Sequence, residues 1–403
     1  MKSHVFALRS VLCGVLAVST VTGVARADDN DGGSCGAAGT SRVLATMPVT
    51  STGYQPTGPT YPEGTAVVGS RVIVSGPANF GTAGNGSPSQ LTIFDRHSGA
   101  LRMQVPVVGE DLSAEHALSE LASWGDYVYS PSTQLGVLRW RIRGNGQTPA
   151  QERVSTPFCS ATGAFPCHVD TTRCPADVRP GLPPLPNGIT VDAHGTSYVT
   201  DALQGIVWRI PARDDDDGPS TPEVFACSRA LQGSGTEGLS LFGANGIAER
   251  DGALYVSVTF GPMEATGPSS VIYRIAKNSP ATLTPVFTYH PVQVAPGVMV
   301  PPIADGVRIH PRTGHLFVVL GGQNQVSELD VSRSPVVEVG RFSRTGSDHP
   351  FSNPSTVAFS PDGDSAYVSN HAIMCCLAGD PNPACVCSGA QNLFGVVELC
   401  VSR

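Results

Sequence analysis

The fold is decided by a stretch that reads PNGITVDAHGTSYVTD from Pro186 to Asp201. It recurs as ANGIAERDGALYVSV from Ala244 to Val258 and as ADGVRIHPRTGHLFVV from Ala304 to Val319. Each copy has an oxygen-bearing residue before a glycine, then alternating apolar residues, a turn and a second apolar strand. Such a unit cannot bury its faces alone, so the copies must stack on one another. Strand repeats stacked radially form a β-propeller, in which the start of each innermost strand faces the central axis.

Three weaker copies complete the repeat. They begin near Pro62, Ala117 and Asn353, so that six copies fill the chain beyond its N-terminus. The sequence therefore predicts an all-β protein, a six-bladed β-propeller with four-stranded antiparallel blades. The segment RVLATMP, Arg42–Pro48, is expected to complete the sixth blade as its outer strand.

The N-terminus has the features of a secretory signal. Lys2 and Arg9 provide positive charge, Val11–Val21 is mostly apolar, and Ala25-Arg26-Ala27 is an A-x-A cleavage site. The apolar stretch is short for a membrane span, and no later segment supplies one. We therefore expect a secreted or periplasmic protein without a membrane span. The expected organisation is a signal peptide over 1–27, cleaved after Ala27, a flexible linker over 28–40 and the propeller over 41–403.

The charge of the chain excludes one class of partner. The formal net charge is −8, and removal of the leader takes away three basic residues and no acid, which makes it −11. Lys277 is then the one lysine that remains. An acidic surface poor in lysine binds nucleic acid weakly, so we expect no nucleic-acid partner. The expected oligomeric state is a monomer.

The cysteines also favour export. Eleven become ten once the leader with Cys13 is removed, and they fall into two even groups. The groups are Cys159, Cys167, Cys174 and Cys227, and Cys35 with Cys375, Cys376, Cys385, Cys387 and Cys400. In an oxidising compartment the expected role is disulfide formation, which would tie the N-terminal tail to the last blade. A zinc or iron–sulfur site built from the four cysteines between 375 and 387 is the alternative.

Four copies of the repeat share an oxygen donor before the glycine. The residues are Glu63, Asn187, Asn245 and Asp305, two carboxylates and two amides. If these positions converge on the axis, they form a site for a hard divalent cation, with Ca²⁺ as the natural occupant and Mg²⁺ or Mn²⁺ as substitutes. The structural alternative is that they are ordinary turn dipeptides, in which Asn-Gly and Asp-Gly are common.

These residues resemble a known family. The copies PEG at Pro62–Gly64, PNGITVDAHGTSYVTD, ANGIAERDGALYVS and ADGVRI are similar to the senescence marker protein/gluconolactonase/luciferin-regenerating enzyme family of calcium-dependent six-bladed propellers. The related NHL-repeat and strictosidine-synthase-like propellers share the strand pattern. The order Glu63, Asn187, Asn245, Asp305 matches the family's ligand order. The cysteine-rich insertion Phe158–Pro186 departs from the family pattern, and it leaves the substrate open.

The resemblance implies a chemistry for the site. Asp305 would be both metal ligand and general base, Asn187 a ligand that also contacts substrate or water, and Glu63 and Asn245 metal ligands. The substrate would be a small lactone or ester, whose carbonyl the cation polarises. Two alternatives stay open: a secreted binding propeller with a structural ion, and an NHL-like interaction module without a metal. Of the scattered histidines, His349 and His371 are the candidates for the channel mouth, because they flank the last inner strand.

Overall fold

The computed structural model describes residues 37–48, 61–77, 82–84, 86–143, 146–158, 182–212, 218–343, 351–371 and 394–401. All of them belong to one compact unit, Cys35–Arg403. The expected signal peptide and most of the expected linker lie outside the described residues, so both stay predictions. In the described part of the chain, no helix is long and apolar enough to span a membrane.

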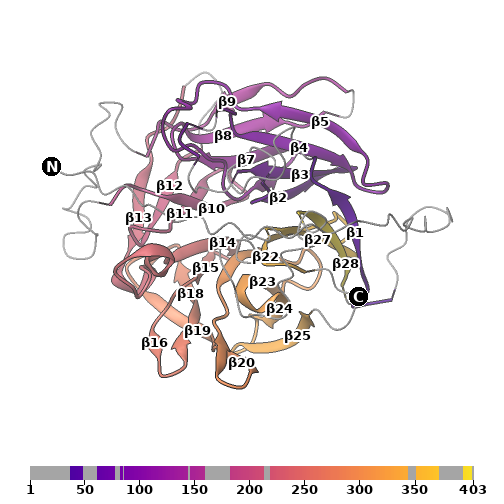
Figure 1. Ribbon diagram of the computed structural model, residues 1–403. Coiled ribbons are helices and arrows are strands. Elements are labelled where there is room, and N and C mark those ends of the chain that lie inside the picture. The colour runs from indigo at the N-terminus through magenta and orange to yellow at the C-terminus, as the bar shows by residue number, and fades with distance from the viewer. Residues whose placement is uncertain are drawn as a thin grey trace, which may run out of the picture. The chain divides into compact units, whose positions relative to one another are not determined.

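Six four-stranded antiparallel sheets succeed one another around a common centre (Figure 1), which confirms the predicted six-bladed propeller. Blade one is β2 (Thr65–Val68), β3 (Arg71–Gly76), β4 (Gln90–Asp95) and β5 (Leu101–Pro106); blade two is β6 (Ala122–Trp124), β7 (Tyr127–Ser132), β8 (Gly136–Arg141) and β9 (Gln151–Arg153). Blade three is β10 (Pro186–Val191), β11 (Ser197–Asp201), β12 (Ile206–Ile210) and β13 (Glu223–Cys227); blade four is β14 (Ala244–Arg250), β15 (Ala253–Val258), β18 (Ser270–Ala276) and β19 (Leu283–Tyr289). Blade five is β22 (Ala304–Ile309), β23 (Leu316–Leu320), β24 (Gln325–Asp330) and β25 (Val337–Ser343); blade six is β26 (Pro354–Phe359), β27 (Ser365–Asn370), β28 (Gly395–Cys400) and β1 (Ser41–Thr46).

The sixth blade joins the two ends of the chain. Strand β1 pairs antiparallel with β28, so that Ser41 lies opposite Leu399 and Thr46 opposite Gly395. The prediction that Arg42–Pro48 forms the outer strand of this blade is therefore confirmed. Because the ring closes through this pairing, β28 is not an exposed edge strand.

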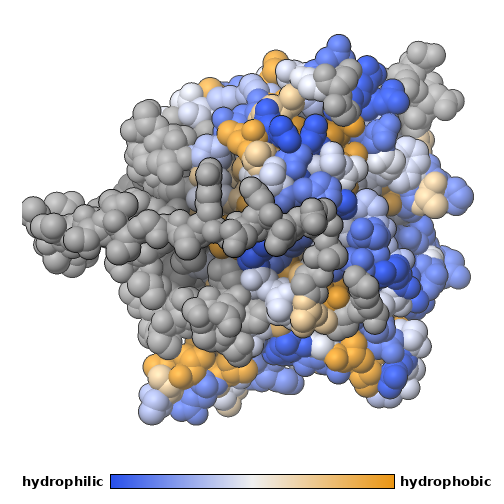
Figure 2. All heavy atoms as spheres, turned by 90° about the vertical axis from the view of Figure 1, so that its right-hand side faces the viewer, coloured by the Kyte–Doolittle hydropathy of each residue, from blue (hydrophilic) through white to orange (hydrophobic). Residues whose placement is uncertain are grey.

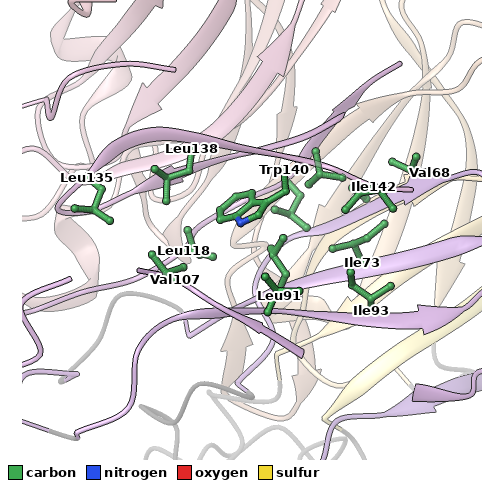
Figure 3. Packing of buried hydrophobic residues seen from close by; sticks show 14 residues of the cluster. Val68, Ile73, Leu91, Ile93, Val107, Leu118, Leu135, Leu138, Trp140 and Ile142 are labelled. Carbon is green, nitrogen blue, oxygen red and sulfur yellow. The ribbon is translucent and has the colours of Figure 1, made fainter. Parts of the chain in front are cut away.

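Apolar cores lie between neighbouring blades. Between blades one and two, the fully buried Trp140 of β8 lies among aliphatic side chains of both sheets (Figure 3). These include Ile73, Leu91, Leu118 and Leu138. Alternation along each strand places these side chains on the faces where two sheets meet, so each blade is stable only beside its neighbours.

The innermost strands meet around the axis. Successive inner strands contact one another from β2 to β6, β10, β14, β22 and β26, and β26 returns to β2. Since strands alternate in direction, all six begin at the same end of the propeller, here called the ring end. The hairpins β16 (Met263–Glu264) with β17 (Gly267–Pro268), and β20 (Val292–Ala295) with β21 (Val298–Val300), also connect strands at this end.

The surface is predominantly polar. In the view of Figure 2, hydrophilic residues are spread over the face. Apolar residues form separate groups, and larger groups lie along the lower edge. The described large hydrophobic side chains that are exposed come from many strands and loops, among them Val108, Trp124, Met263 and Val339. Scattered exposure of this kind is normal for a folded protein.

Candidate cation centre on the propeller axis

Bulges place the oxygen donors at the ring end. Asn187, Asn245 and Asp305 are each the second residue of an innermost strand. In these three blades the pairing with the second strand shifts register across the donor and its glycine, at Pro186/Ile189, Ala244/Ile247 and Ala304/Val307. A β-bulge re-aims a side chain relative to the regular alternation of a strand. The four predicted donors therefore occupy one repeat position, with Glu63 just before β2.

The glycines after the donors permit close approach of neighbouring inner strands. A Cβ atom on Gly188 would lie 2.2 Å from the Asn245 carbonyl oxygen, and one on Gly246 would lie 2.5 Å from that of Asp305. Real side chains do not tolerate such distances, so only glycine fits here. The Asn-Gly and Asp-Gly pairs are thus parts of packed strands, and the alternative that they are turn dipeptides is wrong.

Hydroxyl groups hold the main chain of the donor residues in place. The Ser257 hydroxyl donates to the Asp305 carbonyl oxygen at 2.6 Å, and the Thr200 hydroxyl donates to that of Asn245. The Glu63 carbonyl oxygen accepts from Ser355 and Ser369, at 2.7 and 2.8 Å. In each case a residue of one blade holds the main chain of the next blade's donor. This buried hydrogen bonding makes the geometry of the donors on the axis, here called the ring, rigid.

A third carboxylate belongs to the same position and was missed from the sequence. Glu120 precedes β6 as Glu63 precedes β2, and its side chain is almost fully buried. Its Oε2 accepts from the Ile189 N–H at 3.1 Å, and its Oε1 lies 3.1 Å from Nη2 of Arg308. The signal was present, because Glu120 stands in the copy that begins at Ala117 in the register of Glu63. Leu121 follows it in place of glycine, which hid the pattern.

The ring concentrates negative charge in a water-poor place. Burial raises the pKa of Asp305 well above its usual value, and the neighbouring charges of Glu63 and Glu120 raise it further. Burial also raises the pKa of Glu120 to about 7, although Arg308 and the Ile189 N–H stabilise its charged form. Asp305 is enclosed by protein but keeps some exposed surface, as a side chain that lines a channel does. A cation is the ligand that would relieve this repulsion.

The two amides differ in their surroundings. The Asn245 side chain is buried, and its Nδ2 lies 3.0 Å from the Thr259 hydroxyl oxygen. That hydroxyl already donates to the Ala304 carbonyl oxygen, so it must accept from Asn245, which leaves Oδ1 as the free acceptor of the amide. Asn245 also hydrogen-bonds the Asp305 carboxylate. Asn187 is half-buried, and its carbonyl oxygen accepts from the Glu120 N–H at 3.2 Å.

His371 lies over Glu63. Its Nε2 is 3.0 Å from Glu63 Oε2, and both side chains are at most 10% exposed. The contact lacks hydrogen-bond geometry, and neither atom has a hydrogen-bond partner among the described residues. The imidazole also packs on Tyr61 at a ring-centroid distance of 4.6 Å. Of the two histidines predicted at the channel mouth, His371 lies beside the ring and His349 lies outside the described residues.

Strained backbone adjoins the ring. Ile303, just before β22, has φ +51°, a conformation that is rare for a β-branched residue. Its carbonyl oxygen accepts from the Gly321 N–H, and the next N–H, of Ala304, donates to the Ser270 hydroxyl at 3.0 Å. Residues in such conformations cost roughly 1–3 kcal/mol and cluster at functional sites.

The residues present fit a divalent cation. A buried set of three carboxylates and two amides, opposed by one guanidinium, offers hard oxygen donors and an excess of negative charge. Within the described residues, no group of three or more His, Cys, Asp and Glu side chains is placed to hold a metal. This finding is consistent with a mixed site, since two of the donors are amides and Glu120 is bound to Arg308.

Two cysteines of the predicted groups are among the described residues. Cys227 and Cys400 are each disulfide-bonded. The other cysteines of the two groups lie outside the described residues, as does the alternative site between residues 375 and 387. The grouping and the pairing therefore stay predictions.

Comparisons with known proteins show the fold. No family model and no curated protein matches the chain. Solved structures that match include a PQQ-bound aldose sugar dehydrogenase from Streptomyces coelicolor, with 13% identity, TM-score 0.50 and coverage of 90% of this chain and 97% of that one. A luciferin-regenerating enzyme matches with 14% identity, TM-score 0.49 and coverage of 84% and 91%.

Regucalcin, a calcium-binding protein from Agrobacterium tumefaciens strain C58, matches with 12% identity, TM-score 0.49 and coverage of 89% and 92%. The six four-stranded blades, together with the aldose sugar dehydrogenase match, show the propeller fold that the resemblance implied. Identities this low establish a shared architecture and no activity.

Proposed function

We propose that this protein is a metal-dependent hydrolase of the gluconolactonase type, which acts on a lactone or ester with a calcium ion on the propeller axis. The observation that carries the proposal is the cluster of Glu63, Glu120 and Asp305, in which Glu120 is paired with the Arg308 guanidinium and the charges of the two glutamates act on Asp305. Buried charges are rarely left unbalanced, because desolvation of an isolated charge costs several kcal/mol. One divalent cation would complete the balance.

Glu63, Asn245 and Asp305 would hold the ion, with Asn187 at its half-buried edge. Calcium suits this donor set, and Mg²⁺ or Mn²⁺ are the alternatives. When bound, the ion would act as a Lewis acid on a carbonyl oxygen.

The chain's own residues would handle the protons. Asp305 would serve as general base toward water, and Asn187 would orient the water or the substrate through its amide. His371, with its Nε2 beside Glu63, would donate a proton to the leaving oxygen. Histidine is a common general acid in enzymes.

A non-catalytic binding propeller is the second candidate. It is favoured by Glu120, whose oxygens are bound within the protein, and by the lack of a group of three His, Cys, Asp or Glu ligands in the described part of the chain. In this case the ion would be structural or absent, and the surface around the ring would bind a partner.

Calcium titration calorimetry of the mature protein tests the ion site. We expect one ion per chain, and a loss of affinity of at least about 100-fold in Asp305→Asn, because one full charge leaves a site of low dielectric. Asp192→Asn is the matched control, since Asp192 binds Lys277 at the opposite end of β10. Equal binding by wild type and Asp305→Asn would refute the axial site.

Hydrolysis separates the two candidates. With calcium added, the wild type is expected to hydrolyse small lactones or esters, and His371→Gln is expected to lower kcat by a larger factor than it changes calcium affinity. Calcium binding without turnover across a broad panel of lactones and esters would leave the binding propeller.

We also propose export with cleavage after Ala27, as supported by the leader sequence. Expression in a bacterial host should yield, in the periplasm or the medium, a protein whose N-terminal residue is Asp28. A chain retained in the cytoplasm with its leader intact would contradict this proposal.

A further inference from the structure

Arg308 crosses the centre of the propeller beneath the ring. It extends from β22 in blade five, and its Nη2 donates to the Leu121 carbonyl oxygen at 2.6 Å in blade two. Its Nη1 and Nε lie 3.4 Å from the carbonyl oxygens of Ile189 in blade three and Val357 in blade six. The Leu121 carbonyl lies one position after the donor Glu120, and the Ile189 carbonyl lies two positions after the donor Asn187. One guanidinium therefore joins four blades directly below the donors.

The same guanidinium engages Glu120. Nη2 lies 3.1 Å from Oε1, while Oε2 accepts from Ile189 N–H, and Glu120 is only 2% exposed. Glu120 also accepts a main-chain hydrogen bond from Ile247, so three of its roughly four lone-pair sites are engaged within the protein and few remain for an ion above it. Glu63 differs, because its Oε2 accepts no hydrogen bond among the described residues and has only His371 Nε2 beside it, at 3.0 Å.

We propose that Arg308 is a built-in counter-cation that withholds Glu120 from the ring and leaves two carboxylates, Glu63 and Asp305, for a single divalent ion. This inference rests on the proposed ion site and deepens it. Arginine suits the role because it stays charged at every relevant pH and its planar fork binds carboxylate and carbonyl oxygens together. The number and the charge of bound ions would then be set by a residue that touches no ion.

The proposal makes opposite predictions for the two partners. In Glu120→Gln the charge of Arg308 is no longer balanced and repels the ion. In Arg308→Gln the carboxylate of Glu120 is released toward the ring. One unit charge within about 8 Å of a divalent ion changes its affinity by more than tenfold at an effective dielectric constant of about 20.

Calcium calorimetry and calcium-dependent shifts of Tm test the pair. Glu120→Gln is expected to bind one ion at least about tenfold more weakly, and Arg308→Gln to bind at least about tenfold more tightly or to take up a second ion. The double variant should return to within about threefold of wild type, since the two charges are removed together. Arg308→Lys keeps the charge but not the planar fork, so its calcium affinity should lie closer to that of wild type than the affinity of Arg308→Gln does.

Arg250→Gln is the matched control. Arg250 also joins two blades, through the Gly314 carbonyl oxygen, but at the far end of β14 from Asn245. If Arg250→Gln changes calcium affinity as Arg308→Gln does, loosening of the propeller explains both and the proposal is overturned. If Arg308→Gln does not fold, the tenfold weakening in Glu120→Gln decides.

The outcomes separate this inference from the proposed function. If wild type binds no divalent ion, the proposed ion site fails and the inference with it. Suppose that wild type binds one ion, that Asp305→Asn binds none, and that Glu120→Gln and Arg308→Gln both bind calcium as tightly as wild type. In that case only the inference fails.

Discussion

A single glycine decides whether two neighbouring ring donors lie side by side. Gly246 faces the Asp305 carbonyl oxygen and the Val307 N–H, each 2.5 Å from the position of an added Cβ. Gly246→Ala should therefore push β14 and β22 apart, lower the free energy of unfolding by about 1–3 kcal/mol and weaken calcium binding. Denaturant unfolding and calorimetry measure the two effects.

Gly261→Ala is the control for this substitution, because its added carbon would lie 3.1 Å from its nearest neighbour, the Ser269 carbonyl oxygen of the same blade, and would not meet an inner strand. It should change stability less and calcium affinity not at all. A Gly246→Ala protein as stable as wild type would mean that the inner strands spread without cost.

Most of the ring was predictable from single residues. An oxygen donor followed by glycine marked Glu63, Asn187, Asn245 and Asp305, because close packing of inner strands demands that glycine. Glu120 escaped, since Leu121 fills a core site where four of the other blades carry glycine. The role of Arg308 was not predictable, because its partners come from three other blades and no local pattern records them.

At the scale of the strand and its turn, Asp95 closes the β4–β5 hairpin. Its carboxylate accepts from Arg102 at 2.9 Å and from the main-chain N–H groups of His97 and Ser98. The Arg102 and Ser98 hydrogen bonds hold the pKa of Asp95 well below its usual value. A depressed pKa means that the stabilisation is present above the usual value of about 3.9 and is lost as the pH falls through the folded-state pKa.

Asp95→Asn should therefore lower the free energy of unfolding by about 1–2 kcal/mol at pH 7. The difference from wild type should shrink as the pH falls below about 4. Denaturant unfolding at a series of pH values measures this. A difference that is constant with pH would show that the charge of Asp95 is not what stabilises the turn.

Strands were predictable where alternation runs long enough. The copies that start at Pro186, Ala244 and Ala304 gave full-length strands at the expected places. Blade two was harder: its first strand, β6, has three residues, and Leu118 pairs with Ser132 as an isolated bridge before the ring position interrupts the ladder. The hairpins β16–β17 and β20–β21 escaped prediction, because strands of two to four residues show no usable period.

On the scale of the whole molecule, blade six closes the propeller. Cys400 ends β28, its N–H donates to the Thr40 carbonyl oxygen at 2.8 Å, and its own carbonyl oxygen accepts from Gly39. Cys400 is disulfide-bonded at this junction. Cys400→Ser should lower the free energy of unfolding by about 2–5 kcal/mol under oxidising conditions.

Denaturant unfolding with and without reductant measures the effect. With reductant, wild type and Cys400→Ser should converge, which serves as the control. Equal stability of the two proteins without reductant would mean that the cross-link adds nothing to the β1–β28 pairing.

The pairing of β1 with β28 also determines when the sixth blade can fold. Strand β1 is synthesised before the other described strands and pairs with the last of them, so the sixth blade stays unfinished until β28 has been made. Five blades assembled earlier would still leave an open arc, with β1 waiting for a partner. If the chain is exported and crosses the membrane unfolded, this delay keeps the propeller incomplete until β28 has crossed as well. The propeller would then close on the far side of the membrane, where its cysteines can be oxidised.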